Sequence, residues 1–486
     1  MAEYLTKLFI DGSWQDAISG ETFAVINPAD GSELVRIADA NAEDMLKAID
    51  SAQKAQAGWA ATPALERSRI LRKAAEIARA DIDRLAHVLT MEQGKPLAQA
   101  LGEITYGLDF IEWFAEEARR TYGTTVPSTG PDKRIVAIKQ ATGVSVAITP
   151  WNFPALQILR KLGAALAAGC AMIVKPAALT PLSALEIGKY FAEAGLPDGV
   201  LQVVTSSRAS RVSEAIMSDS RVRVVSFTGS TEVGKVLMRE GSTTMKRLAL
   251  ELGGHAPFIV FEDADLDHAL EQLISVKMRN MGQTCVSANR IFVQRSIAEE
   301  FTRRVVERLS SMKVGFGTES DVEVGPLINA GAVDKVESHV ADAIANGATV
   351  AAGGKRPSGA ALANGHFYEP TVLTGVTDEM IIARDETFGP VAPIFEFDTE
   401  EEVIERANNS PFGLAAYFFT RDVNRLVRVS EALEYGTVGA NDGSISAVQA
   451  PFGGVKESGI GREGGHWGMD DYMDIKYISL AGLTRP

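Results

Sequence analysis

Short apolar runs alternate with helical stretches between residues 143 and 241. The runs have the length and β-branched content of buried strands: GVSVAIT (143–149), AMIVKP (171–176), VLQVV (200–204) and RVVSF (223–227). Helical spacing follows across 155–168, and another helix opens near Ser230. This alternation predicts a parallel, doubly wound sheet, whose default ligand is a nucleotide.

A second α/β series begins at PFIVF (257–261) and predicts a second domain. Its expected helices lie near 265–280, 297–311, 330–346, 400–408 and 422–433, and its expected strands near 290–294, 391–397 and 436–440. Upstream, apolar residues at intervals of three and four across 66–96 predict one amphipathic helix, which Gly94 and Pro96 end.

Two alternating stretches, 133–140 and 473–482, belong to neither series. Strict alternation predicts strands with two different faces, and isolated strands need a partner for their backbone groups. The sequence therefore predicts paired or edge strands and, through them, an oligomer.

Composition narrows the class of protein. The 486 residues suggest about three domains, and 46% hydrophobic with 23% charged residues is typical of a globular chain. A net charge of −15 disfavours nucleic acid or an anionic membrane as the main partner. The longest uncharged stretch, 141–159, contains Pro150 and Pro154, and the N-terminus offers no apolar signal-peptide core, so we expect a cytoplasmic protein.

Three segments are candidate phosphate sites. GIGREG (459–464) matches GxGxxG but follows no strand, so a connecting loop is the better interpretation. GSTEVGKV (229–236) matches GxxxxGK between a strand and a helix, yet Val236 replaces the Ser/Thr that ligates Mg²⁺ in a P-loop. A P-loop-like ATPase is therefore the weaker alternative, and the surviving feature is a helix N-terminus near Ser230. Lys175, at a strand end, is the third candidate.

Cys170 and Cys285 are the two cysteines of the chain, too few for a disulfide framework or a cysteine-rich metal site, and we expect no metal. Cys170 has apolar neighbours and is interpreted as packing. Cys285 lies among polar residues, and Arg279 and Arg290 nearby predict a lowered thiol pKa and a nucleophile. Glu251, between apolar residues and a glycine pair, is a candidate general base or a core carboxylate.

Seven ordered motifs resemble those of the aldehyde dehydrogenase superfamily along nearly the whole chain: TPWNFP (149–154), KPA (175–177), FTGSTEVG (227–234), LELGG (250–254), GQTCVSANR (282–290), ETFGPV (386–391) and PFGGVKESG (451–459). The resemblance implies an α/β fold with a Rossmann-like coenzyme domain, a second α/β catalytic domain and a small β oligomerisation element. The implied boundaries are 1–122 and 141–253 for the coenzyme domain, 254–465 for the catalytic domain, and 123–140 with 466–486 for strands that build dimers or tetramers.

The resemblance implies aldehyde oxidation to a carboxylic acid through a cysteine thiohemiacetal and thioester. By position, Cys285 matches the nucleophile, Asn152 the oxyanion donor, and Glu251 the base for deacylation. Glu251 argues against a CoA-acylating relative, which needs no hydrolytic base. Ser287 stands where some relatives carry a second, redox-active cysteine, so no such switch is expected.

The coenzyme contacts are also implied by the resemblance: Trp151, Lys175, Ala178, Gly229, Ser230, Leu252, Glu386 and Phe388. Relatives that prefer NAD often carry glutamate at the position of Ala178, where its charge repels a 2′-phosphate. Alanine removes that repulsion, and Arg208 or Arg211 can add attraction, so the sequence favours NADP with NAD as the alternative.

Within the superfamily, the segments 279–290, 441–454 and 459–477 resemble succinate-semialdehyde dehydrogenases. Arg160, Arg279 and Ser446 match positions that bind the distal carboxylate of the substrate, which suits charge-assisted donors. A structural ion pair is the other interpretation of Arg279. The alternatives are glutarate semialdehyde, 2-oxoglutarate semialdehyde or a general aldehyde. Glu463 matches a carboxylate sometimes placed in a proton relay, with a surface role equally open, and His255 replaces a frequent lysine.

Overall fold

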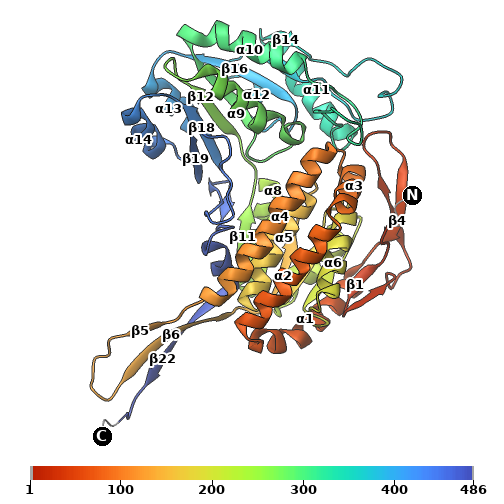
Figure 1. Ribbon diagram of the computed structural model, residues 1–486, viewed down its shortest axis with the longest axis vertical. Helices are drawn as coiled ribbons and strands as arrows, with labels where there is room; N and C mark the ends of the chain where they lie inside the picture. Colours follow the sequence, from red (N-terminus) through yellow and green to blue (C-terminus); the bar gives the residue numbers. More distant parts are fainter. Residues whose placement is uncertain (1–3, 484–486) are drawn as a thin grey trace.

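The computed structural model describes residues 4–483 and shows the predicted α/β fold class, with two wound sheets and a small projecting sheet (Figure 1). The first sheet runs in the order β2 (Ser13–Gln15), β1 (Leu8–Ile10), β9 (Leu201–Val203), β8 (Met172–Lys175), β7 (Val144–Ile148), β10 (Val222–Thr228), β11 (Arg247–Glu251) and β21 (Gly459–Ile460). The strands from β9 to β11 are parallel, and β1 and β21 are antiparallel additions.

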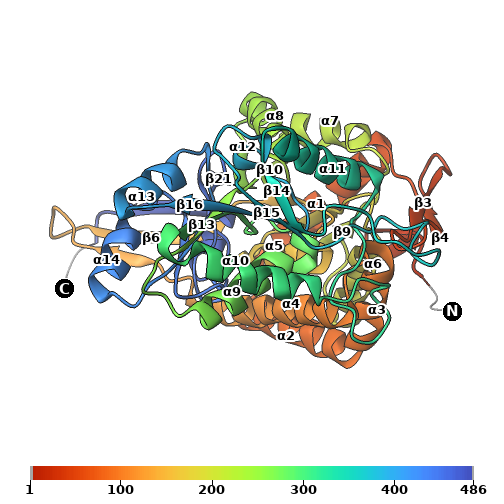
Figure 2. The ribbon, with the colours of Figure 1, turned by 90° about the horizontal axis from the view of Figure 1, so that it is seen from above.

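Helices cover both faces of the first sheet, as a doubly wound fold requires (Figure 2). One face carries α1 (Ala42–Ala61), α7 (Ser210–Ser218) and α8 (Thr231–Gly241). The other carries α5 (Pro154–Ala168) and α6 (Leu182–Glu193), with α2 (Ala64–Ala80), α3 (Ile82–Gln93) and α4 (Leu97–Glu117) packed outside them. Because α5 lies between the sheet and α4, every one of its residues is buried. The chain reverses direction across the sheet between β7 and β10, where such folds bind ligands.

The predicted single helix over 66–96 is wrong, because α2 and α3 are separate helices that meet at Asp81. Asp81 leaves helical geometry at φ −116° and ψ 20°, and its carboxylate accepts hydrogen bonds from Arg84 and from Tyr190 on α6. The apolar spacing continues across the break, so periodicity alone does not reveal it. The predicted end is confirmed: Gly94 caps α3 in the left-handed region at φ 93°.

The second sheet follows the order β14 (Thr349–Ala352), β15 (Thr371–Thr374), β16 (Val391–Phe397), β13 (Ala288–Gln294), β12 (Ala256–Val260), β18 (Ala415–Phe419) and β19 (Thr437–Ala440). Its helices are α9 (Leu266–Met278), α10 (Ala298–Ser310), α11 (Ala330–Ala345), α12 (Ile381–Arg384), α13 (Glu400–Asn408) and α14 (Val423–Ala432). The helices that the sequence predicts here are present. Strands β14, β15 and β18 were not predicted. One continuous apolar core joins sheet and helices.

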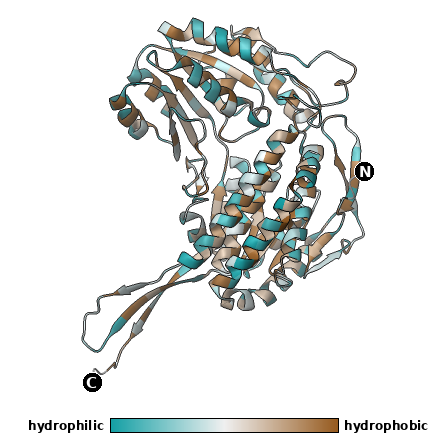
Figure 3. Cartoon of the chain, in the orientation of Figure 1, coloured by the Kyte–Doolittle hydropathy of each residue, from teal (hydrophilic) through white to brown (hydrophobic). Residues whose placement is uncertain are grey.

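The two unassigned alternating stretches form β6 (Arg134–Ala141) and β22 (Met473–Leu480), which pair with each other in an antiparallel ladder. With β5 (Thr124–Val126) they project from the body, with apolar side chains along them (Figures 1 and 3). Ile475 is 74% and Tyr477 64% exposed. The remaining strands form small pairs: β3 (Thr22–Ile26) with β4 (Glu33–Ala38), and β17 (Phe412–Gly413) with β20 (Val455–Lys456). Within residues 4–483, no helix has the length and apolarity needed to cross a membrane.

Candidate active site

Cys285 lines one of two cavities of about 320 Å³ each, and its chain neighbour lines the other. Cys285 and Asn152 line one cavity, whereas the next residues in the chain, Val286 and Phe153, line the other. The cysteine loop packs closely on the segment that follows β11: a Cβ on Gly254 would stand 2.1 Å from the Cys285 carbonyl oxygen. Glycine at that position therefore lets the two sheets approach each other at the thiol.

The structure contradicts the predicted low thiol pKa. Burial raises the pKa of Cys285 to about 12, Glu386 and Glu251 add to the rise, and Arg160 and Arg279 oppose it. Arg290 does not contribute to lowering the pKa of the Cys285 thiol. Its guanidinium instead donates to backbone carbonyl oxygens and to the Tyr435 hydroxyl. Partial burial therefore favours the thiol form over the thiolate in this state, and the proton must leave before the sulfur attacks.

Asn152 lies in the turn between β7 and α5 and is 5% exposed. Its Nδ2 donates to the Gln283 carbonyl oxygen at 3.0 Å, two residues before Cys285, and its Oδ1 accepts from the Phe153 amide. An amide group has two N–H donors, so one remains for a ligand. The side chain is therefore attached to the cysteine loop and lines the same cavity as the thiol.

Glu251 ends β11 and is buried, and within the described chain its Oε2 has no hydrogen-bond partner. Burial, followed by the charge of Glu463, raises its pKa well above the usual carboxyl range, while Lys161 and Arg160 oppose the rise. Glu463 is itself held ionised by Lys161 and Arg160, whose nitrogens lie 2.5 and 3.0 Å from its oxygens. A buried carboxyl with a free oxygen and a raised pKa is suited to general-base chemistry.

The cavity that holds the thiol lies at the switch point of the first sheet. Its walls include most of the predicted coenzyme contacts: Trp151, Gly229, Ser230, Leu252, Glu386 and Phe388. Ser230 caps α8, so the positive end of that helix faces this crevice. The Trp151 and Phe388 rings meet edge to face, 5.5 Å apart, and Phe388 has a left-handed backbone at φ 56°.

Glu386 and Lys335 place a carboxyl group and an amino group in this cavity. Burial raises the pKa of Glu386 to about 8, and Lys335 opposes the rise. The sequence reasoning missed Lys335. Helical spacing in the sequence could have indicated it, because Ala332 and Lys335 follow the N-cap residue Asn329 at intervals of three. All three residues line the cavity.

Lys175 and Ala178 lie at the end of β8, outside the lining of this cavity. Burial lowers the pKa of Lys175 to about 8, and Asp39 opposes the fall. Ala178 is partly exposed. Arg211 is paired with Asp39 at 2.9 Å and with Glu21 at 2.6 Å, so its charge is already partly neutralised.

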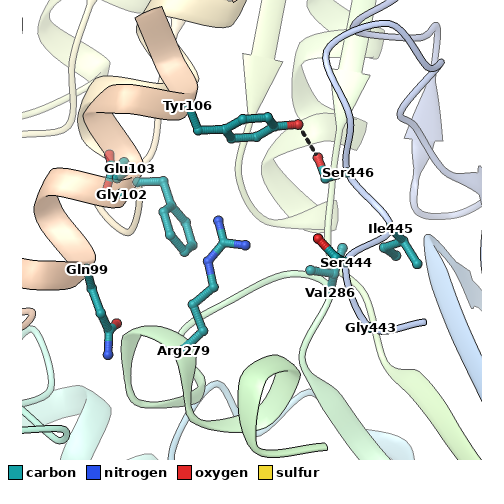
Figure 4. A pocket seen from close by; sticks show the side chains of 11 residues that line it. Gln99, Gly102, Glu103, Tyr106, Arg279, Val286, Gly443, Ser444, Ile445 and Ser446 are labelled. Carbon is teal, nitrogen blue, oxygen red and sulfur yellow. Dashed lines mark hydrogen bonds between the residues drawn. The ribbon is translucent and has the colours of Figure 1, made fainter. Parts of the chain in front are cut away.

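The second cavity contains Arg279 and Ser446, as predicted for a substrate site (Figure 4). The Arg279 guanidinium lies 4.7 Å from the Phe153 ring centroid and, among residues 4–483, has no carboxylate partner. Arg160 does not line this cavity. Its guanidinium is paired with Glu463 and lies between the Phe110 and Phe452 rings.

One face of α4 also lines the second cavity, and the sequence reasoning missed it. Gln99, Gly102, Glu103 and Tyr106 are spaced as one helical stripe, and the Tyr106 hydroxyl is 2.8 Å from Ser446 Oγ (Figure 4). Polar residues at helical spacing in an otherwise apolar helix were the available signal.

The lysine that a P-loop would use to bind phosphate does not face the crevice. Lys235 is more than half exposed and forms an ion pair with Glu457 at 2.8 Å, away from the residues that line the crevice. The GxGxxG segment begins in β21, which pairs with the strand that carries Glu251. Lys235 therefore does not line the crevice, and the glycine segment adds an edge strand to the first sheet.

A doubly wound sheet with a crevice at its switch point, next to a partly buried cysteine and a buried carboxyl, defines a coenzyme-dependent oxidoreductase with a thiol at its centre. The model of the aldehyde dehydrogenase family matches residues 14–478. The chain belongs to the aldehyde dehydrogenase family, and it is an NAD(P)-dependent enzyme.

Similar proteins differ in the substrate that they are named for. The chain is 50% identical to the 3-sulfolactaldehyde dehydrogenase of Pseudomonas putida, over 99% of this chain and 98% of that one. It is 50% identical to the glutarate-semialdehyde dehydrogenase of Pseudomonas putida KT2440, with 98% of each covered. It is also 50% identical to the NADP-dependent succinate-semialdehyde dehydrogenase of Escherichia coli K12, over 98% of this chain and 97% of that one. The crystal structure of succinate-semialdehyde dehydrogenase from Burkholderia pseudomallei superimposes with a TM-score of 0.96, at 53% identity and 98% coverage of each chain.

Proposed function

We propose that the protein oxidises succinate semialdehyde to succinate. The observation that carries the proposal is the Arg279 guanidinium, which lines a cavity beside Cys285 and has no carboxylate partner within the described part of the chain. A free guanidinium in a partly buried cavity suits the distal carboxylate of a short semialdehyde. Ser446 and Tyr106 add hydroxyl groups on the same cavity. The equal similarity to a glutarate-semialdehyde dehydrogenase makes glutarate semialdehyde the second candidate.

The crevice fits a nicotinamide coenzyme, because it opens at the switch point, has the α8 N-terminus for a pyrophosphate and has Glu386 for ribose hydroxyls. When bound, the coenzyme accepts a hydride from the substrate carbon. By resemblance to the family, Lys175 and Ala178 are expected to contact the adenosine ribose. Since Ala178 carries no charge to repel a 2′-phosphate, we favour NADP over NAD.

The first half of the reaction uses Cys285 and Asn152. The thiol passes its proton to a solvent water molecule, and the sulfur attacks the aldehyde carbon to form a tetrahedral oxyanion. The second N–H of Asn152 and the backbone N–H of Cys285 donate to that oxyanion, which stabilises charge present only in the transition state and intermediate. Loss of hydride from the carbon then leaves a thioester on Cys285.

The second half of the reaction uses Glu251. Its ionised carboxylate takes a proton from a water molecule, the hydroxide adds to the thioester carbon, and the carboxylic acid leaves as the Cys285 sulfur is released. Among the described residues, Glu251 Oε2 has no hydrogen-bond partner, and the pKa of Glu251 is raised. Both observations support this role, because a carboxylate in an apolar site is a stronger base than one in water.

Substituting Glu251→Gln is expected to block the second half and spare the first. The raised pKa means that the ionised base form of wild-type Glu251 grows as pH rises above the ordinary carboxyl range, so wild-type kcat should increase with pH there. The variant should lose about 100-fold in kcat and lose that pH dependence. Stopped-flow absorbance should still show a burst of one reduced coenzyme per active site. A variant with wild-type kcat and pH profile would contradict the assignment.

Initial rates with a panel of aldehydes test the proposed function directly. Succinate semialdehyde, glutarate semialdehyde and butanal are compared with NADP and with NAD. We expect the highest kcat/KM for succinate semialdehyde with NADP, and roughly 100-fold less for butanal, which has no carboxylate. Higher kcat/KM for glutarate semialdehyde would select the second candidate, and a hundredfold preference for NAD would overturn the coenzyme proposal.

We also propose that β5, β6 and β22 join copies of this chain into a dimer or tetramer. The exposed Ile475 and Tyr477 on the projecting sheet support this, because large apolar side chains on an open edge favour association. In this proposal 1–122 with 141–253 form the coenzyme domain, 254–465 the catalytic domain, and 123–140 with 466–486 the joining element. The unbonded Cys170 and Cys285 fit a reducing cytoplasm. Light scattering measures the assembly size.

A further inference from the structure

Asn280 and Met281 form a strained corner between α9 and the Cys285 loop. Both residues have left-handed backbones, at φ 51° and 57°, and both are fully buried. Side chains with a Cβ avoid this conformation, and two in succession are rarer still. Strain of this kind persists only where surrounding contacts maintain it, and it concentrates at functional sites.

The Asn280 side chain maintains the corner through a set of buried hydrogen bonds. Its Nδ2 donates to the Asn152 carbonyl oxygen at 2.8 Å and to the Gln283 carbonyl oxygen at 3.3 Å. Its Oδ1 accepts from Gln93 Nε2 at 3.0 Å, and its backbone N–H donates to Gln99 Oε1 at 2.7 Å. Asn280 therefore contacts the turn of Asn152, the cysteine loop and two helices of the first domain at once.

A second buried donor converges on the same carbonyl oxygen. Lys95 Nζ lies 2.8 Å from the Asn152 oxygen, is paired with Glu103 and stands 4.0 Å from the Phe153 ring centroid. Since Asn152 Nδ2 in turn donates to Gln283, the main chain and the side chain of Asn152 are both attached to fixed partners. The closed loop of bonds runs Asn280 to Asn152 to Gln283 and back to Asn280.

We propose that Asn280 is a positioning residue. It fixes the position of the second Asn152 N–H relative to the Cys285 thiol, so that this N–H can donate to the oxyanion. The inference rests on the proposed function of Asn152 and Cys285. A donor stabilises an oxyanion only within a narrow range of distance and direction, so release of either segment lowers the rate of thiohemiacetal formation. Ground-state binding of aldehyde and coenzyme changes little, because Asn280 lines neither cavity.

Asn280→Gly removes the side chain and preserves the corner, because glycine accepts the left-handed backbone without strain. We expect the burst rate of reduced coenzyme to fall roughly 30-fold, with KM for both substrates within threefold of wild type. Asn289→Ala is the matched control: it removes a buried asparagine that contacts Lys277 but not Asn152, and its burst rate should stay within threefold. A burst rate for Asn280→Gly within threefold of wild type would overturn the inference.

A double-mutant cycle separates positioning from a general structural role. In an Asn152→Ala background, Asn280→Gly should lower the burst rate less than twofold, because there is no donor left to position. An equal fall in both backgrounds would overturn the inference. A wild-type burst rate in Asn152→Ala alone would instead reject the proposed role of Asn152. If Asn280→Gly does not fold, Asn280→Asp carries the same comparison, since it keeps the acceptor for Gln93 and loses the donor.

Discussion

Cys285→Ala is expected to lower kcat for aldehyde oxidation by at least about 10⁴-fold, because loss of a covalent nucleophile removes the route through the thioester. The structure offers no substitute sulfur, since Cys170 is fully buried in the first domain with its Sγ 3.2 Å from the Tyr472 carbonyl oxygen. The measurement is the rate of reduced-coenzyme formation with saturating succinate semialdehyde.

Cys170→Ala is the control for Cys285→Ala. It removes the other thiol from an apolar site, and kcat should remain within twofold of wild type while stability falls. Fluorescence titration should show that Cys285→Ala still binds reduced coenzyme. Retained aldehyde oxidation in Cys285→Ala would contradict the proposed nucleophile, and Mg²⁺-dependent ATP hydrolysis that survives it would favour the P-loop alternative.

Arg279→Ala is expected to change the substrate preference of the enzyme. Removing the guanidinium leaves the distal carboxylate of succinate semialdehyde without a charged donor, so kcat/KM should fall roughly 100-fold. For butanal, which has no carboxylate, the fall should be less than threefold. The comparison of the two kcat/KM ratios measures the carboxylate contact separately from any general damage to the site.

Two further variants complete this test. Arg279→Lys separates charge from donor geometry, and Arg303→Ala is a surface control. Lysine keeps the charge but lacks the planar pair of donors, so it should recover part of the preference. Arg303 is an exposed arginine on α10, paired with Glu300, and its substitution should leave both kcat/KM values unchanged. Equal losses for succinate semialdehyde and butanal in Arg279→Ala would show that Arg279 supports the fold rather than the substrate.

The fold was largely predictable, because βαβ alternation is a local pattern. The strand, turn and helix from 143 to 168 all appear within a residue or two of their expected positions. The break at Asp81 was missed because the apolar spacing continues across it, and Tyr190, one partner of the Asp81 carboxylate, is more than a hundred residues away in the chain. Strand β18 was missed because FGLAAYFF has the uniform apolar character of a strand buried on both faces, with no alternation to reveal it.

The site shows the same division between local and long-range information. Arg279 and Ser446 could be placed together from motifs, but the pairing of Arg160 with Glu463 depends on segments about 300 residues apart. The predicted thiol pKa was wrong for the same reason. Neighbours in the sequence include two arginines, whereas neighbours in space include Glu386 and Glu251 and a buried environment that disfavours the thiolate.

By itself the sequence determined the α/β class, the family and the identity of Cys285, Asn152 and Glu251 as candidates, because these depend on periodicity and on motifs within short windows. Only the tertiary structure decided which charges are free. Arg279 faces a cavity while Arg160 is neutralised by Glu463, and Asn280 meets Asn152 across more than a hundred residues. The physical reason is that pKa values and hydrogen bonds depend on distance and burial, which chain separation does not encode.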